Sequence, residues 1–161
     1  MPKFKLDEID HQILDMLIEN ARTPFTDIAK KLLVSAGTIH VRVKKMEDEG
    51  VIKGSTLTVD YDKMNYSFIA YIGLFIENSS FTQRIVDDLN KIPEVTVAHL
   101  TTGKFAVFCK IRARDTKHAK EIIFKIDNIQ GVLRTETSIS LEEVINDKKR
   151  LMHAIFDQYK I

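Results

Sequence analysis

The stretch SAGTIHVRVKKMEDEG, residues 35–50, decides how the first part of this chain folds. Its apolar residues Ile39, Val43 and Met46 are four and three positions apart, so they share one face of a helix. Ser35 supplies a capping oxygen at the start, and Gly50 stands where helices commonly end. We therefore predict a helix from about Ser35 to Glu49 that packs through one face.

Two further helices are predicted before this one. An apolar stripe through Ile13 and Leu17 follows Asp7, a typical cap residue, and predicts a helix over about 7–20. Thr23 as cap and Pro24 as first helical residue predict a second helix. Residues 51–55 and 56–59 are predicted to form two short strands around a Gly-Ser turn. The pattern is that of a winged helix-turn-helix, a unit that places its last helix in the major groove of DNA.

The exposed face of the helix over 35–49 has the composition of a DNA-reading surface. Small residues at its start let a helix approach base edges, polar and apolar side chains beyond them can contact bases, and lysines one turn further on suit phosphates. Lys53, on the predicted wing, could touch a neighbouring phosphate. The candidate DNA-binding residues are Ser35, Ala36, Gly37, Thr38, His40, Val41, Arg42, Lys44, Lys45 and Lys53.

Overall charge does not identify a partner, since the net charge is +1 at pH 7. Residues 35–46, however, contain three basic residues and no acid. The alternative is that this basic face is merely solvated. Two features count against it: a second helix precedes it through a short turn, and Gly37 costs about 1 kcal/mol relative to alanine in a helix without improving packing.

The second half of the chain predicts a different layout. Residues 61–66 are polar and are taken as a linker between a domain over 1–60 and one over 67–141. Within the latter, strands are predicted over 68–76, 95–100, 105–111 and 132–141, and helices over 81–92 and 116–126. The order βαββαβ is that of a ferredoxin-like fold. The predicted class is therefore α+β.

Several fragments in order resemble the Lrp/AsnC family of feast/famine regulators. They are Leu6 to Asp10, Asn20-Ala21-Arg22, Val34 to Val43, Gly50-Val51-Ile52, Glu94-Val95-Thr96, Thr101-Thr102-Gly103 and Thr135-Glu136-Thr137. The resemblance covers residues 5 to 145, and Ser35 to Val43 is similar to the AsnC branch. It implies a winged helix-turn-helix joined to a ferredoxin-like effector-binding and oligomerisation domain, called RAM in this family.

The resemblance also implies partners and a second site. Family members dimerise through their sheets, often assemble into octamers, bind palindromic double-stranded DNA and respond to a free amino acid, for which the AsnC-like character favours asparagine. The effector lies between ligand-binding domains, near the turn joining the middle strands. Carried over, the candidate effector-binding residues are Thr101, Thr102, Gly103, Lys104, Thr135 and Thr137. The alternative is that Thr-Gly-Lys is simply a favourable hairpin turn.

Two positions depart from the family pattern. The turn before the predicted DNA-reading helix usually has a glycine where this chain has Leu33, so Leu33 is expected to need an unfavourable backbone conformation or a changed turn. An aspartate common after the Thr-Gly turn is replaced by Ala106, which removes any ligand contact made through that carboxylate.

The remaining features exclude other classes of protein. Five scattered histidines and one cysteine predict no metal site, cofactor or catalytic site, and the apolar runs are too short to span a membrane. The lone Cys109 fits a reduced, cytoplasmic protein. Residues 142–161 predict a helical tail that packs on its own domain or on a partner subunit. Two alternatives to an amino-acid-responsive regulator stay open: a tetrapyrrole-decarboxylating enzyme on the same scaffold, and an amino-acid sensor without DNA affinity.

Overall fold

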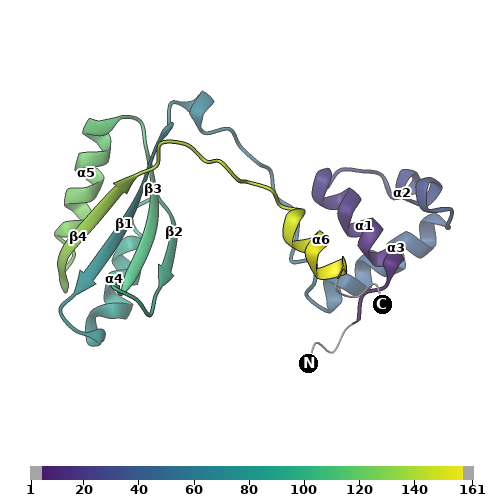
Figure 1. The fold of residues 1–161 in the computed structure, drawn as a ribbon, viewed down its shortest axis with the longest axis horizontal. Helices are drawn as coiled ribbons and strands as arrows, with labels where there is room; N and C mark the ends of the chain where they lie inside the picture. The colour runs from purple at the N-terminus through teal and green to yellow at the C-terminus, as the bar shows by residue number, and fades with distance from the viewer. Residues whose placement is uncertain (1–4, 158–161) are drawn as a thin grey trace. The chain divides into compact units, whose positions relative to one another are not determined.

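The computed structural model describes residues 5–157, which form two compact units. The first unit comprises the chain up to Thr58 together with the chain from Ile145 onward. The second comprises Val59–Val144. The ends of the predicted 1–60 domain and 142–161 tail, residues 1–4 and 158–161, lie outside the described residues. Figure 1 gives the element labels used below.

Three helices of the first unit form its core. They are α1 (Glu8–Glu19), α2 (Phe25–Leu32) and α3 (Ala36–Asp48). Ile13, Ile28, Ile39 and Met46 are fully buried between them, which follows from the apolar spacing in each helix. Asp7 caps α1 in a reciprocal capping box with Asp10, and Ser35 caps α3 by accepting the Thr38 N–H at 3.0 Å. The predicted helices 7–20 and 35–49 are thus confirmed to within a residue at each end.

Two local predictions in this unit are wrong. Pro24, not Thr23, is the N-cap of α2, because the Thr23 hydroxyl donates instead to the Asn20 carbonyl at 2.7 Å and closes the turn after α1. The predicted strands over 51–59 do not form in the described structure. Leu57 and Val59 are 70% and 45% exposed there, so no core anchors a hairpin, and an isolated two-stranded ribbon is marginal in water.

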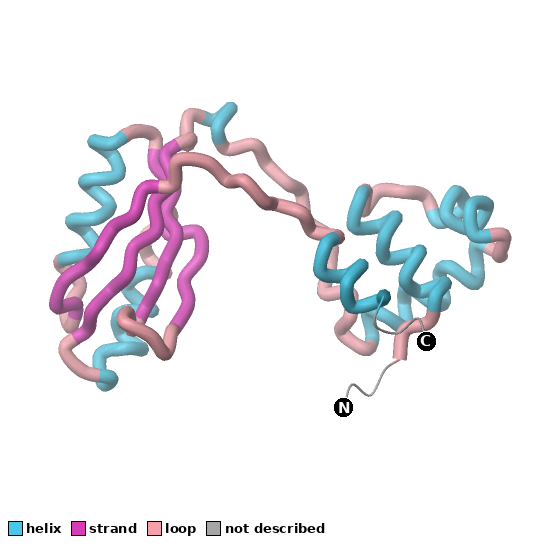
Figure 2. The backbone as a smooth tube through the Cα atoms, viewed as in Figure 1, coloured by secondary structure: helices cyan, strands magenta, loops and turns pink. Residues whose placement is uncertain are grey.

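The second unit is a four-stranded antiparallel sheet with the strand order β2-β3-β1-β4. Its elements follow the predicted βαββαβ sequence: β1 (Phe68–Ile76), α4 (Thr82–Leu89), β2 (Val95–Leu100), β3 (Val107–Ala113), α5 (Thr116–Asp127) and β4 (Val132–Ile139). This is the predicted ferredoxin-like topology. Figure 2 shows both helices on the same face of the sheet.

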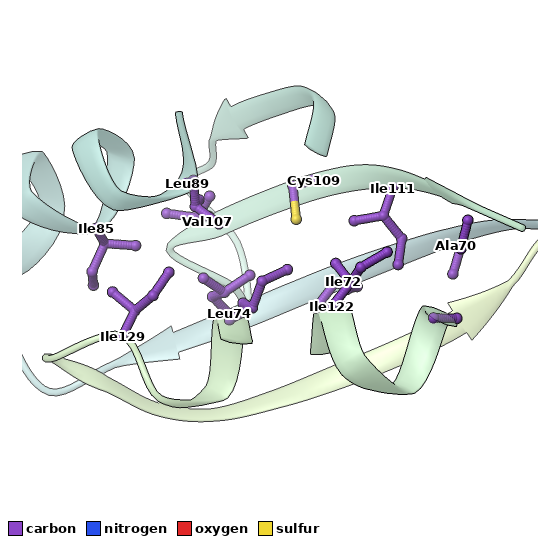
Figure 3. Packing of buried hydrophobic residues seen from close by; sticks show 13 residues of the cluster. Ala70, Ile72, Leu74, Ile85, Leu89, Val107, Cys109, Ile111, Ile122 and Ile129 are labelled. Carbon is purple, nitrogen blue, oxygen red and sulfur yellow. The ribbon is translucent and has the colours of Figure 1, made fainter. Parts of the chain in front are cut away.

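Side-chain alternation along the central strands creates that unit's core. Ile72 and Leu74 of β1 and Cys109 of β3 point toward α4 and α5, where Ile85 and Ile122 close over them (Figure 3). The opposite face carries an aromatic group in which the ring centroids of neighbouring side chains lie 5.2–5.9 Å apart. Its members are Tyr71, Phe75, Phe105 and Phe108.

The segments outside these elements are anchored to one unit each. In the expected linker 61–66, a short 3-10 helix (Asp62–Met64) is held by Arg112 of β3, which lies 3.2 Å from Asp62 and donates to the Tyr66 carbonyl at 3.1 Å. The tail forms α6 (Arg150–Asp157), which packs on the first unit through Met152.

Candidate nucleic-acid interface and effector turn

The exposed face of α3 brings the candidate DNA-binding residues together. Ile39, Val43 and Met46 are buried, and the residues between them point outward. Val41 is 66% exposed. Exposed with it are Ser35, Ala36, Gly37, His40, Lys44 and Lys45, while Thr38 and Arg42 are half-buried. Lys53 is exposed on the irregular segment that follows α3.

Hydrogen bonds fix the side chains at the start of α3. The Ser35 and Thr38 hydroxyl oxygens are 2.8 Å apart, so each restricts the other's rotation. Gly37 lies in ordinary helical backbone, and a Cβ atom there would meet only the Ser35 hydroxyl at 3.7 Å. The His40 ring lies 6.0 Å from the Phe25 ring of α2. The fold therefore does not require a glycine at position 37. The absence of a side chain leaves the surface of α3 there open to a molecule outside the protein.

Arg42 is bound to two carboxylates of the first helix. Its Nη1 donates to Asp7 Oδ2 at 2.6 Å and to Asp10 Oδ1 at 2.8 Å. These bonds raise the pKa of Arg42, the Asp10 contribution being the larger. Burial works to raise the pKa of Asp7, but the Asp10 N–H and Arg42 together lower it. Arg42, predicted to fork onto guanine or phosphate, therefore already holds two anions and fastens α3 to α1.

The sequence carries a signal for this network. Asp10 lies on the apolar stripe of α1, one turn before Ile13 and Leu14, and it is 5% exposed. A buried acid requires a partner, since an unpaired charge in a protein interior is costly. A depression of about 510 Å³ borders the network, and Gly37, Thr38 and Val41 line its α3 side.

The candidate effector turn joins β2 to β3. Its backbone is held by the Thr101 N–H donating to the Ala106 carbonyl at 3.1 Å, and the Thr101 hydroxyl bonds the Phe105 carbonyl. Thr102 and Gly103 are exposed, and a Cβ atom on Gly103 would meet nothing within 4 Å. The turn is thus exposed, and its backbone groups are accessible to a ligand.

Lys104, a candidate effector-binding residue, forms an ion pair within the chain. Its Nζ lies 2.6 Å from Glu136 Oε2 and 5.2 Å from the centre of the Phe105 ring. Arg134 also pairs with Glu136, at 2.9 Å, and stacks 3.6 Å above the Phe75 ring. The Lys104 hydrogen bond is the main reason why the pKa of Glu136 is lowered. Glu136, which is not among the predicted site residues, joins the turn to β4 through this ion pair.

The two threonines proposed on β4 lie away from this cluster within one chain. Thr135 pairs with Leu74 and Thr137 with Ile72, both residues on the helix-covered face, and Thr135 donates to Asp127 of α5 at 2.7 Å. Glu136 pairs with Gly73 on the opposite face. The structure therefore groups Thr101–Lys104 with Glu136, and places Thr135 and Thr137 on the other side of the sheet.

Gly73 is the residue that lets the turn fold back onto the sheet. A Cβ atom at this position would collide with the Phe105 ring. Ala106, at the position where the family commonly has aspartate, contributes only its backbone, through an N–H donated to the Leu74 carbonyl at 3.0 Å. The residues after the turn therefore brace it against β1.

The described residues form no candidate metal site. His99 pairs across the sheet with Phe108, and no group of three histidine, cysteine or acidic side chains among residues 5–157 could hold a metal ion. Nor is any helix in that range long and apolar enough to cross a bilayer.

Comparison with protein families agrees with the two units. Residues 6–53 match the model for winged helix-turn-helix DNA-binding domains, and residues 69–149 match the Lrp/AsnC ligand-binding domain. The chain is 35% identical over 141 residues to the regulatory protein AsnC of Haemophilus influenzae, covering 87% of this chain and 94% of that protein. It is 34% identical over 146 residues to AsnC of Escherichia coli, covering 90% and 96%.

Solved structures show the same fold. The structure of Escherichia coli AsnC superposes with a TM-score of 0.85 at 33% identity and covers 90% of this chain and 98% of its own. A Neisseria meningitidis transcriptional regulator, solved as a complex with L-methionine, gives a TM-score of 0.84 at 21% identity over 89% and 95% of the two chains. Because both family models and these relatives agree, the chain belongs to the Lrp/AsnC family and is a helix-turn-helix transcriptional regulator that carries a ligand-binding domain.

Proposed function

We propose that α3 enters the major groove of a palindromic operator, and that an amino acid bound at the turn 101–104 modulates this binding. The observation that carries the first part is the division of α3 into two faces. Its apolar residues are buried, whereas the outward face combines small residues at the start with lysines near the end. A helix that enters the major groove reads bases with its amino-terminal residues.

The candidate DNA-binding residues have roles that their environments support. Thr38 presents a hydroxyl oriented by Ser35, and the largely exposed Val41 can cover a thymine methyl group. Ala36 and Gly37 leave room for base edges. Lys44, Lys45 and Lys53 bind phosphates, and His40, supported by the Phe25 ring, contacts the groove edge.

Arg42 has a different part in this proposal. Its guanidinium holds α3 on α1 through Asp7 and Asp10, and its side chain remains 27% exposed. A phosphate can therefore reach the outer edge of the guanidinium while both ion pairs persist. Arg42 accordingly sets the angle of α3 rather than reading a base directly.

The DNA proposal is tested by selecting binding sequences from random duplex DNA and measuring affinity by fluorescence anisotropy over a range of salt concentrations. Lys45→Ala should weaken binding to all sequences and reduce the slope of log K against log salt by about 1, because one phosphate contact is lost. Val41→Ala should instead relax the preference at one base position. Lys120→Ala on α5 is the matched control. If no sequence were enriched from the random DNA, or if the parent and Lys45→Ala gave equal salt slopes, the proposal would be contradicted.

The second part of the proposal concerns the effector. The open turn at Thr102 and Gly103 offers backbone donors and acceptors to an α-amino acid, at an interface between the ligand-binding domains of two chains. The ligand-binding family model and the L-methionine complex of the Neisseria meningitidis regulator support an amino acid as the class of ligand. The AsnC-like stretch from Ser35 to Val43 favours asparagine. Thr135 and Thr137 then contribute only if the partner chain brings them to the site.

A thermal-shift screen of the twenty amino acids tests the effector, because a ligand that binds the folded state raises its stability. Gly103→Val should abolish the response to the amino acid that the screen finds. Basal DNA affinity should stay unchanged, since a side chain there projects into open space. Equal titrations of parent and variant would refute this site.

The oligomer and the class of activity complete the proposal. The aromatic group Tyr71, Phe75, Phe105 and Phe108 on the helix-free face of the sheet suits dimerisation, and dimers would assemble into octamers in the cytoplasm. Relatives at 34–35% identity are named regulatory proteins, which supports a regulator and not an enzyme. Light scattering measures the assembly. A monomer at micromolar concentration would overturn it, and a bound tetrapyrrole in the absorption spectrum would favour the enzyme.

A further inference from the structure

The C-terminal helix α6 returns to the DNA-binding unit after the chain has completed the ligand-binding unit. The first unit is built from two separate stretches, up to Thr58 and from Ile145 onward, with the second unit inserted between them. The ligand-binding unit is therefore connected to the DNA-binding unit at both of its ends. The ligand-binding family model stops at residue 149, and α6 begins at Arg150.

α6 docks on α1 through a combination of apolar and charged contacts. Met152 packs against the core of the DNA-binding unit, and the Phe156 ring stacks on His11 of α1. Figure 1 shows the two helices next to each other, α6 in yellow and α1 in purple. Met152 and Phe156 thus place α6 against the DNA-binding unit, and Phe156 contacts the same helix that supports α3.

Charged groups fix the position of α6 along α1. Lys149 Nζ lies 2.7 Å from Glu19 and 3.5 Å from Asp15, and His153 Nε2 lies 2.7 Å from Asp15. Asp147 caps the start of α6 by accepting the N–H groups of Lys149 and Arg150 at 2.8 and 3.1 Å. Lys148 donates to the Thr58 hydroxyl at 3.0 Å, so the two stretches of the unit also meet where the chain leaves and re-enters it.

We propose that α6 is a strap: its docking on α1 closes a second connection between the ligand-binding and DNA-binding units and restricts the freedom of the recognition helix α3. The link from α6 to α3 is continuous. His153 of α6 binds Asp15 of α1, and Lys149, the residue before α6, binds Glu19. Helix α1 in turn holds Arg42 of α3 through Asp10. Restricting that freedom before binding lowers the entropic cost when two DNA-binding units of a dimer engage a palindrome.

The strap differs from simple helix packing in one measurable respect: its effect depends on the length of the connection. Inserting twelve Gly and Ser residues between Val144 and Ile145 leaves the docking surfaces intact but slackens the connection. Ending the chain after Val144 removes α6 entirely. Appending the same twelve residues after Ile161 is the matched control for added flexible chain.

Docking needs a readout of its own. The chain contains no tryptophan, so Phe156→Trp introduces a single reporter at the contact with His11. With Phe156→Trp in each, the emission should be blue-shifted in the otherwise unchanged chain, in the insertion variant and in the C-terminal control. Met152→Asp in the reporter background should shift it to the red, because a carboxylate cannot enter the apolar core. Red emission from the Phe156→Trp chain without any other change would show that α6 is undocked and would overturn the proposal.

The decisive measurement is operator affinity by anisotropy. This step rests on the DNA-binding function proposed above, which the parent's own affinity tests separately. We expect the insertion variant to bind about fivefold or more weakly than the parent, with α6 still docked, and the C-terminal control to match the parent. Unchanged or tighter binding by the insertion variant would overturn the strap. If only the truncated chain were weakened, α6 would be a local stabiliser and the proposal would again fail.

Discussion

The guanidinium of Arg42 on α3 lies 2.8 Å from the carboxylate of Asp10 on α1, a side chain that is only 8% exposed. The same Nη1 atom also binds Asp7, the cap residue of α1. The residue most suited by its chemistry to bind DNA is therefore also the residue that joins α3 to its supporting helix. The stability of the unit and the proposed phosphate contact therefore involve the same side chain.

Arg42→Ala should lower the free energy of unfolding of the DNA-binding unit by about 1–3 kcal/mol, because it leaves the buried Asp10 carboxylate without its partner. Chemical denaturation followed by far-UV circular dichroism measures this. Lys44→Ala on the same helix is the matched control: its ion pair with Asp48 is 3.9 Å long and exposed, so the change should stay within about 0.5 kcal/mol. Equal stability of the two variants would show that the network does not hold α3.

Gly37→Ala should separate stability from recognition. Alanine is preferred in a helix and the added methyl finds only an ordinary contact with Ser35, so we expect a gain of about 0.5–1 kcal/mol in stability. The same methyl stands where α3 is proposed to approach base edges, so operator affinity should fall. Denaturation and anisotropy on the same preparation check both signs. A more stable variant with unchanged affinity would remove Gly37 from the interface.

Leu33→Gly should stabilise the turn before α3. Leu33 has φ 57° and ψ 39°, the left-handed conformation that costs a residue with a Cβ atom about 1–2 kcal/mol, and its side chain is 92% exposed. Allowing for the greater unfolded-state entropy of glycine, the net gain should be about 1 kcal/mol. Leu33→Ala keeps the strain and loses little packing, so it should match the parent. A destabilised glycine variant would show that the leucine has a contact that offsets its strain.

The sequence predicted those features that depend on neighbours along the chain. Asp7 and Ser35 cap their helices as expected, and Leu33 adopts the unfavourable conformation that its place in the turn implied. The pairs that shape the sites join residues far apart, as Arg42 with Asp10 and Lys104 with Glu136. Those pairings depend on how elements pack, which spacing within one helix or strand does not reveal.

The predicted wing shows the limit in the other direction. Alternating β-prone residues over 51–59 satisfy the local rule for strands, yet Leu57 finds no core to cover it. For the tail, the apolar spacing predicts a helix but does not identify its partner, and the structure packs Met152 against the first unit. Local patterns thus indicate which segments can form helices or strands. Tertiary packing determines whether they form and which surface they pack against.

Cys109 offers a site-specific probe of the ligand-binding unit. The thiol is 1% exposed, and burial raises its pKa from 9.0 to about 11. The folded protein should therefore resist thiol reagents at pH 8 and react only after local or global opening. The rate of reaction with a chromogenic disulfide should slow when the amino-acid effector is bound. Rapid labelling of the native protein would place Cys109 outside the core.

The raised pKa of Cys109 also predicts how the free energy of unfolding changes at alkaline pH. A thiol held neutral by burial contributes stability that is fully present below its unfolded pKa of 9.0 and is lost as the pH rises toward about 11. The free energy of unfolding should thus decline over this interval in the parent and decline less in Cys109→Ala, compared by denaturation at several pH values. Parallel curves for the two proteins would contradict the burial of the thiol.

Acid should release α6 through Asp15. The hydrogen bond with His153 lowers the pKa of Asp15, burial raises it, and the charge of Lys149 lowers it. The net result is a pKa below 3.8. A carboxyl with a lowered folded pKa contributes stability that is present above its unfolded pKa and is lost as the pH falls through the folded value. Docking of α6 should therefore weaken below about pH 4, the reference range of an aspartate. In the Phe156→Trp background the emission should move to the red over this window. Asp15→Asn, which cannot titrate, should show a weaker docked signal that stays constant there, while Glu19→Gln, at the more exposed partner of Lys149, should keep the transition. A transition that persists unchanged in Asp15→Asn would assign the release to another group.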